Sequence, residues 1–324
     1  MRKTLQALLR EREVGLLALV ALLTVLTGAR APAFLAPGNW RDILVNCAPV
    51  LVLACGLMPV ILTGEIDISL GSLTGLLAGL VAVTASTAEL AWPPALCLPL
   101  TLAAGLLIGL GTGALVTLGR VPSIIATLGL LTALRGVTIW VMGGNTIGDF
   151  PPALRWWGTG VLLGVPVMLW IAALVTALTG WILTRTALGR RLYALGSNPA
   201  AARLAGLSER NLKLFVFAWA GLLTAVATLM TVGKLGNIDT SLGRGLELLV
   251  VTCVVVGGVS ISGGRGTLRG VALAVLLMVM IKTVLIFLNL GDEATKWERA
   301  IQGAFILFAV VLDRLSARRA GGLA

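Results

Sequence analysis

A small number of ionisable side chains interrupt the otherwise apolar sequence of this 324-residue chain, and they are its candidates for chemistry. Glu65 and Asp67 stand between two apolar runs that only a few residues connect, while Arg135, Glu247 and Lys282 fall within or beside such runs. Charged groups in apolar surroundings are expensive, and they ordinarily bind a solute or ion or form an ion pair. With one amide added, the candidate solute-pathway residues are Asn46, Glu65, Asp67, Arg135, Glu247 and Lys282.

Some of these residues also have a purely structural explanation. Asp67 or Ser69 would cap a helix that begins near residue 70, which makes the segment around Glu65 a tight turn. Lys282 and Glu247 would form a structural ion pair. The sequence leaves the functional and the structural explanations open.

The sequence lacks the residues of several common catalytic and metal sites. It has no histidine, which excludes His-based triads and HExxH sites, and its four cysteines have no metal-ligand spacing. The glycine-rich run at 263–266 lacks the Lys and the Ser or Thr of a phosphate-binding loop. We therefore expect no catalytic residue, metal or cofactor in this chain, and no ATP hydrolysis of its own.

The elements that hold the candidate residues follow from a composition that is 58% hydrophobic and 12% charged, with a mean hydropathy of +1.00. Apolar runs of about 20 residues, rich in Leu, Ala and Gly, are typical of membrane-spanning helices rather than of barrels. We expect an all-α, polytopic helical bundle that forms a single domain over residues 1–324. About ten spans are predicted, at 14–27, 44–62, 70–86, 95–116, 123–142, 161–183, 214–232, 246–261, 270–290 and 300–312.

Basic residues set the expected orientation of these spans. Residues 184–213 hold six Lys or Arg residues against a single acid, Glu209, and short loops with excess Lys and Arg stay in the cytoplasm. With residues 1–13 as a cytoplasmic N-terminal segment and an even number of spans, both termini are predicted to be cytoplasmic. The net charge of +11 then reflects orientation in the membrane, and we expect no nucleic-acid binding.

A short helix is predicted within the basic segment 184–213. Asn198 is a favourable N-cap, Pro199 fits the first helical position, and Gly206 follows as a stop. Ser208 is placed to cap the next span. Such a helix is either a contact for a cytoplasmic partner or a plain connector between two spans.

Two rows of small residues predict close helix packing. Glycine recurs at four-residue spacing, which lets helix backbones approach one another where lipid supplies no hydrophobic force. These rows indicate packing and say little about function. They comprise Gly71, Gly75 and Gly79, and then Gly105, Gly109 and Gly113.

Four stretches taken together resemble one known family. They are GEIDISLGS at 64–72, PSIIATLG at 122–129 with Arg135 and Gly136, TALGRRLYALGSNPAAARLAG at 186–206, and VGGVSISGGRG at 256–266. They are similar to the permease subunits of ribose-type bacterial ABC importers, a family that includes ribose, xylose, galactose, rhamnose and autoinducer-2 importers. The matches keep the family's order and extend from about residue 44 to residue 312. Lys282 and the sequence VVTCVV at 250–255 depart from the family pattern, which leaves the cargo open.

The resemblance implies a mechanism and partners. Such permeases pair in the bacterial inner membrane, with a second copy or a homologue, and are surrounded by lipid. They bind two cytoplasmic ATPase subunits that hold ATP and Mg, and an external solute-binding protein delivers the cargo. ATP-driven closure of the ATPases would switch the pair between outward- and inward-facing states. The short loop helix would be the coupling helix, made of Asn198, Pro199, Ala200, Ala201, Arg203, Leu204 and Gly206.

The expected function is import of a small hydroxylated solute, such as rhamnose, ribose or another pentose or hexose, or autoinducer-2. Two other functions remain open. An ion-coupled secondary carrier would use Glu65, Asp67 and Lys282. A membrane-embedded enzyme would use the same carboxylates, but the sequence shows no cluster of nucleophile, base and orienting group for it.

Overall fold

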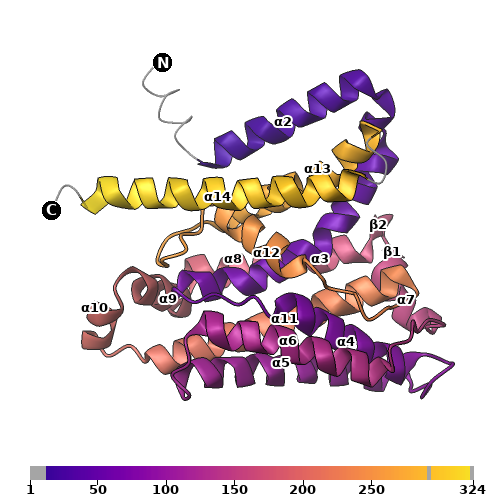
Figure 1. Cartoon of the computed structure of the whole chain (residues 1–324), viewed down its shortest axis with the longest axis horizontal. Helices are drawn as coiled ribbons and strands as arrows, with labels where there is room; N and C mark the ends of the chain where they lie inside the picture. The colour runs from indigo at the N-terminus through magenta and orange to yellow at the C-terminus, as the bar shows by residue number, and fades with distance from the viewer. Residues whose placement is uncertain (1–11, 290–292, 322–324) are drawn as a thin grey trace.

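Figure 1 shows an almost entirely helical chain, and the computed structural model describes residues 12–289 and 293–321. Within these residues the one sheet pairs β1 (Val161–Leu162) with β2 (Val165–Pro166). The all-α class predicted from the sequence is confirmed. The helices are α2 (Arg12–Arg30), η1 (Pro32–Leu35), α3 (Pro37–Leu62), α4 (Leu70–Ala85), α5 (Pro94–Thr117), α6 (Ser123–Met142), α7 (Pro152–Thr159), α8 (Val167–Arg185), α9 (Ala187–Ser197), α10 (Pro199–Leu204), α11 (Glu209–Leu235), α12 (Leu246–Val256), α13 (Leu268–Phe287) and α14 (Glu293–Gly321).

The two ends of the bundle differ in the short elements that they carry. α9 and α10 lie at one end, here called the α10 end, and α7, β1 and β2 lie at the other, the α7 end (Figure 1). Among the described helices, seven are long and apolar enough to cross a membrane, whereas α4 and α12 are apolar but shorter. The predicted last span, 300–312, falls within α14. The seven long apolar helices are α2, α3, α5, α6, α8, α11 and α13.

Several predicted boundaries shift in the structure. The segment 184–213, predicted as one loop, contains the end of α8, all of α9 and α10, and the first turn of α11. Ser208 caps α11 as predicted, because its side chain accepts from the backbone N–H of Asn211 at 3.3 Å. This cap starts the helix at Glu209, before the apolar run itself begins. The predicted span 246–261 is helical only over its first part, α12.

α11 is the central helix of the bundle. It packs against α5, α3, α7 and α4, and α11 and α3 are the most buried of the long apolar helices. The glycine row of α5 permits the α5–α11 contact, because a methyl group at Gly105 would lie 2.6 Å from the carbonyl oxygen of Gly221. Gly109 meets the same part of α11. The packing role predicted for these glycines is confirmed.

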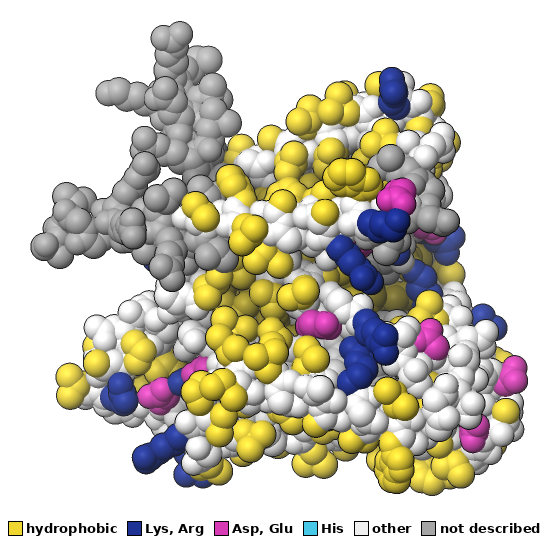
Figure 2. Space-filling view, viewed as in Figure 1, with side chains coloured by type: hydrophobic (Ala, Val, Ile, Leu, Met, Phe, Trp, Pro, Cys, Tyr) yellow, Lys and Arg dark blue, Asp and Glu magenta, His cyan; other side chains and the backbone are white. Residues whose placement is uncertain are grey.

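Apolar side chains cover much of the outer surface of the bundle (Figure 2). Leu107 in the middle of α5 and Leu174 in α8 are 65% and 70% exposed. A soluble protein rarely presents such extended apolar surface to water. These helices are therefore suited to face lipid.

The chain between α11 and α12 turns back into the bundle. Ile238 forms an antiparallel bridge with Ile147 at the α7 end. A few residues later, the carbonyl of Leu242 accepts a hydrogen bond from Arg135 in α6. The intervening segment 239–245 is non-helical, and α12 then continues toward the α10 end over 11 residues. By helix rise α12 covers about 16 Å, roughly half of a hydrocarbon layer.

Candidate functional site

The short helix α10 lies at one end of the bundle and begins as predicted. The Asn198 side chain accepts from the backbone N–H of Ala201 at 3.0 Å, and Pro199 occupies the first helical position. Gly206 follows the helix with a φ of 77°, in the left-handed region that favours glycine. Leu204 is 92% exposed, so α10 presents an apolar side chain at the end of the bundle.

α9, which directly precedes α10, contacts two chain junctions of the bundle. A methyl group at Gly196 would overlap the carbonyl of Leu62, so α9 approaches the end of α3 at backbone distance. The Tyr193 hydroxyl donates to the carbonyl of Gly266 at 2.9 Å, in the link between α12 and α13. The backbone N–H of Gly264 donates to the carbonyl of Leu62 at 2.9 Å. α9 therefore sits where the α3–α4 and α12–α13 junctions meet.

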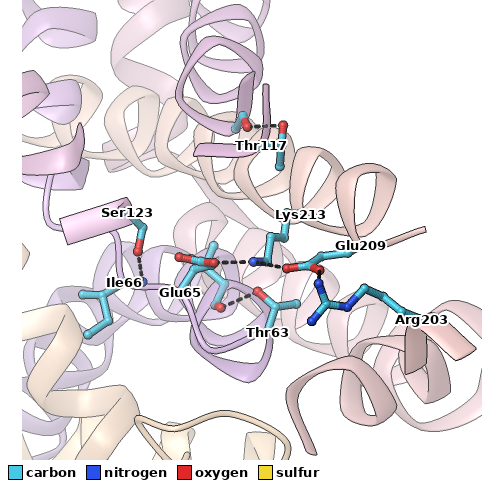
Figure 3. Close-up of polar contacts among 10 residues, drawn as sticks. Thr63, Glu65, Ile66, Thr117, Ser123, Arg203, Glu209 and Lys213 are labelled. Atoms are coloured by element: carbon cyan, nitrogen blue, oxygen red, sulfur yellow. Dashed lines mark hydrogen bonds and ion pairs between the residues drawn. The ribbon is translucent and has the colours of Figure 1, made fainter. Parts of the chain in front are cut away.

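A line of four charged side chains connects α10 to the α3–α4 junction (Figure 3). Lys213 Nζ lies 2.5 Å from Glu65 Oε1 and 2.6 Å from Glu209 Oε1. Glu209 Oε2 lies 3.7 Å from Nη1 of Arg203 in α10. The side chains of Lys213 and Glu65 are each 15% exposed, so the inner pair is largely shielded from solvent. These contacts therefore link charged side chains of α10, α11 and the α3–α4 junction.

Asp67 lies in the same junction but is buried. Its Oδ1 accepts from the backbone N–H of Ser69 at 2.8 Å and from the Ser69 hydroxyl at 2.6 Å. Burial raises the pKa of Asp67, and the two hydrogen bonds from Ser69 oppose this rise. The predicted cap is correct in position only: Ser69 is the N-cap residue of α4, but its side chain makes no cap hydrogen bond.

Arg135 of α6 and Glu247 of α12 come together at the break before α12. Nη1 of Arg135 donates to the carbonyl of Leu242 at 2.9 Å, and Arg135 interacts electrostatically with Glu247. Glu247 Oε1 accepts from the backbone N–H of Gly245 at 3.1 Å. Oε2 is buried and has no hydrogen-bond partner within the described residues. The arrangement leaves an acceptor available beside a guanidinium group.

The remaining two candidates lie apart from these groups. Asn46 accepts from Nζ of Lys234 at 2.5 Å, toward the α7 end. Lys282 is exposed on α13, and no ion pair joins it to Glu247 in the part of the chain that the structure describes. The predicted Lys282–Glu247 pair is therefore wrong, because Glu247 lies beside Arg135 instead. The six candidates occupy several places along the bundle rather than one.

Two of these contacts could not be predicted from the sequence: Lys213 with Glu65, and Arg135 with the Leu242 carbonyl. Lys213 follows Glu209 by four residues, a spacing that does signal an ion pair on a helix. Nothing in the sequence signals its contact with Glu65, and the Leu242 carbonyl has no side-chain signature at all. Over residues 12–289 and 293–321, no group of three His, Cys, Asp or Glu side chains is placed to hold a metal ion.

Comparison with known proteins shows which family this architecture represents. Residues 39–310 match the family described as "Branched-chain amino acid transport system / permease component". The chain is 34% identical to the "Ribose import permease protein RbsC" of Haemophilus influenzae, over 93% of this chain and 91% of that protein. It is 32% identical to the "Autoinducer 2 import system permease protein LsrC" of Escherichia coli, over 93% and 86% of the two chains. This chain belongs to the family of ribose-type ABC importer permeases.

The resemblance carried by the four sequence stretches is thus confirmed. The permease is a multi-pass protein of the bacterial inner membrane, with several helices long enough to cross it. A further relative, the "Probable ABC transporter permease protein YphD" of Escherichia coli, is 34% identical over 95% of this chain and 91% of that one. These relatives are named as permease proteins, and the matched region of this chain includes α10 and α12.

Proposed function

We propose that this permease is the membrane-spanning subunit of an ATP-binding cassette importer for a small hydroxylated solute. The cargo is a monosaccharide, such as rhamnose, ribose or another pentose or hexose, or it is autoinducer-2. The names of the ribose and autoinducer-2 relatives support this range, since both align with 93% of the chain. The observation that carries the proposal is the capped, projecting helix α10 within a chain of this family.

In this proposal the α10 end faces the cytoplasm. The excess of basic residues in 184–213 supports that orientation. With α4, α12 and α14 counted as spans, the chain crosses the membrane ten times, and both termini, including residues 1–13, are cytoplasmic. The whole chain, 1–324, is one permease domain, and its α7 end receives an external solute-binding protein.

α10 is the element proposed to dock on a cytoplasmic ATPase subunit. Ala202 is 5% exposed and faces the permease, whereas Ala201 and Leu204 are exposed. One side of α10 is therefore held while the other is free for a partner. ATP and Mg bind to the ATPase subunits, and this chain needs no cofactor of its own. The docking residues are Asn198, Pro199, Ala200, Ala201, Arg203, Leu204 and Gly206.

Two permeases, a pair of this chain or this chain with a homologue, enclose the pathway. When the ATPases close on ATP, they displace α10, and two connections carry the displacement inward. The ion pairs of Lys213 reach the α3–α4 junction, and the backbone contact of Gly264 with Leu62 reaches the α12–α13 junction. ATP shifts the equilibrium between the two states only if it binds one of them more tightly.

An ion-coupled secondary carrier is less well supported. Glu65 is paired with Lys213, Asp67 is hydrogen-bonded within its own turn, and Lys282 is exposed on α13. The three candidate groups for such a carrier therefore do not share one environment. Ion-coupled transport commonly uses interacting ionisable groups along one route.

Reconstitution tests the importer function. The permease is placed in proteoliposomes with its ATPase and solute-binding partners, and uptake of tritiated monosaccharides and of autoinducer-2 is measured. We expect ATP-dependent accumulation of one of these solutes, chemically unchanged. Uptake driven by a proton or sodium gradient without ATP, or recovery of a chemically altered solute, refutes the proposal.

Two exposed leucines test the role of α10. Leu204→Glu changes a side chain that is 92% exposed on α10, and Leu163→Glu, at 85% exposure near the α7 end, is the matched control. Because neither side chain is in the core, both variants should fold. We expect Leu204→Glu to reduce co-purification of the ATPase at least about tenfold, as for a residue at the centre of an interface. Undiminished co-purification, or an equal loss in the control, contradicts the assignment.

A further inference from the structure

A non-helical segment, residues 239–245, lies at membrane depth between α11 and α12. Gly243 and Gly245 have φ values of 84° and 86°, which interrupt the helix. Ser241, Arg244 and Gly245 are exposed on the surface of the single chain. Irregular backbone at this depth is tolerated only against protein or beside water, because lipid cannot satisfy its polar groups. This face is therefore covered by a second permease or by an aqueous pathway, and not by lipid.

Two glycines of α4 make room for the segment. A methyl group at Gly75 would lie 2.8 Å from the carbonyl oxygen of Leu242. A methyl group at Gly71 would overlap the carboxylate of Glu247. The glycine row of α4 therefore does more than pack helices. It allows the Leu242 carbonyl and the Glu247 carboxylate to lie directly against α4.

Four charged side chains gather around this break. Arg135 is attracted to Glu247 and repelled by Arg244, and Arg244 is attracted to Asp239. The two positive and two negative charges balance. None of the four belongs to an ion pair found in the described residues. Figure 2 shows acidic and basic side chains near the centre of one face, between the positions of α12 and α6 in Figure 1.

The position of Arg135 along α6 gives the depth of these charges in the membrane. By helix rise, Arg135 lies about 10 Å from one end of α6 and about 18 Å from the other. In a hydrocarbon layer of about 30 Å, this is close to the middle. Broken helices with their free ends near the midplane are typical of solute sites in transporters. The charges therefore lie at the depth where transporters commonly bind their solutes.

From these observations we propose that Arg135, Arg244 and Glu247 form a water-accessible site that binds the hydroxyl groups of the solute midway along the pathway. The inference rests on the proposed importer function and names the residues that recognise the cargo. The exposed guanidinium group of Arg244 donates to solute oxygens, and Glu247 Oε2, which is buried in the single chain, accepts from a solute hydroxyl when the pathway opens at this break. A neutral polyol offers both donors and acceptors, which suits a site whose charges balance once the neighbouring Asp239 is counted.

Cysteine labelling tests whether the site meets water. In a permease freed of its native cysteines and assembled with its ATPase and binding protein, Arg244→Cys is treated with a membrane-impermeant methanethiosulfonate. Leu107→Cys is the control, since Leu107 is 65% exposed midway along an apolar helix. We expect labelling at position 244 to be at least about tenfold faster, because only a hydrated thiol ionises and reacts.

Glu247→Gln tests recognition of the solute. Glutamine keeps an oxygen that accepts from Gly245, so it changes only the charge and the free acceptor. Uptake is measured with a mixture of tritiated D-ribose, D-xylose, D-galactose, L-rhamnose and autoinducer-2. It should fall at least about tenfold, as expected for one lost charge-assisted hydrogen bond. The amount of assembled complex should stay within about twofold. Leu248→Gln, at a neighbouring side chain that is 53% exposed, should retain uptake.

The outcomes distinguish a failure of the polyol site from a failure of the importer function on which it rests. Equal labelling at positions 244 and 107, or unchanged uptake by Glu247→Gln, overturns the polyol site. No ATP-driven uptake by the unmodified permease refutes the importer function instead. If Glu247→Gln assembles poorly, Arg244→Gln is measured in its place, because the Arg244 side chain makes no hydrogen bond within the described residues, and unchanged uptake again overturns the site.

Discussion

Lys213 offers a quantitative test of the charged side chains at the α10 end. Lys213→Met removes the ammonium group, keeps an apolar stem, and leaves Glu65 without its ion pair. Breaking a fully buried pair destabilises a protein by about 3–5 kcal/mol. Because the side chains of Lys213 and Glu65 are each 15% exposed, water relieves part of this penalty. We therefore expect a loss of about 2–3 kcal/mol in the free energy of unfolding.

Thermal unfolding of the purified permease in detergent measures this loss. A change of 1 kcal/mol shifts the melting temperature of a chain of this size by about 1.5 °C, so Lys213→Met should lower it by roughly 3–5 °C. Lys296→Met is the matched control, because it breaks an ion pair with Glu293 whose side chains are 73% and 57% exposed. Such an exposed pair contributes under about 0.5 kcal/mol.

A second substitution distinguishes two causes of the lost stability: the missing attraction between Lys213 and Glu65, and the unpaired charge left on Glu65. Adding Glu65→Gln to Lys213→Met should recover most of the lost stability, because residue 65 then no longer carries the charge that lost its partner. Equal melting temperatures for Lys213→Met and Lys296→Met would refute the reasoning. So would a double variant that is less stable than Lys213→Met alone, since Glu65 would then be stabilised by other contacts.

The two remaining predictions concern packing and pH. Gly105→Ala should be less stable than Gly111→Ala by about 1–3 kcal/mol, because its methyl group meets the Gly221 backbone while nothing lies within 4 Å at Gly111. The gain in helix propensity is the same in both variants and cancels, so melting temperatures in the opposite order contradict this packing. Burial raises the pKa of Asp67, so the wild-type protein loses stability as the pH rises through that pKa, whereas Asp67→Asn does not titrate and still accepts from Ser69. The melting temperature of Asp67→Asn should therefore exceed that of the wild type by a margin that grows as the pH is raised above the ordinary pKa of an aspartate, and a constant margin contradicts the prediction.

Local interactions made parts of the α10 end predictable. Asn198 and Ser208 cap their helices through backbone groups three residues away, and Gly206 adopts the left-handed conformation expected of a stop. Each of these features depends on side chains and backbone within one or two turns. For that reason neither α10 nor the cap of α11 required knowledge of the rest of the fold.

The residues proposed for the pathway were predictable only by their side-chain type. Arg135 and Glu247 stand out because they are ionisable in an apolar sequence, but their proximity depends on how α4, α6 and α12 pack. The mistaken pairing of Lys282 with Glu247 has the same origin, since hydropathy gives the depth of a residue and not the face of the bundle on which it lies.

The sequence by itself determined the all-α membrane class, the approximate places of the helices and the caps around α10, because hydropathy and capping act over short stretches of chain. The tertiary structure alone decided that residues 239–245 interrupt a span, that Gly71 and Gly75 admit this segment, and that Lys213 meets Glu65. The sequence pattern of an apolar run with glycines does not distinguish a continuous helix from an interrupted one. Only the packing of distant helices provides the carbonyl and charged partners that hold the broken form in place.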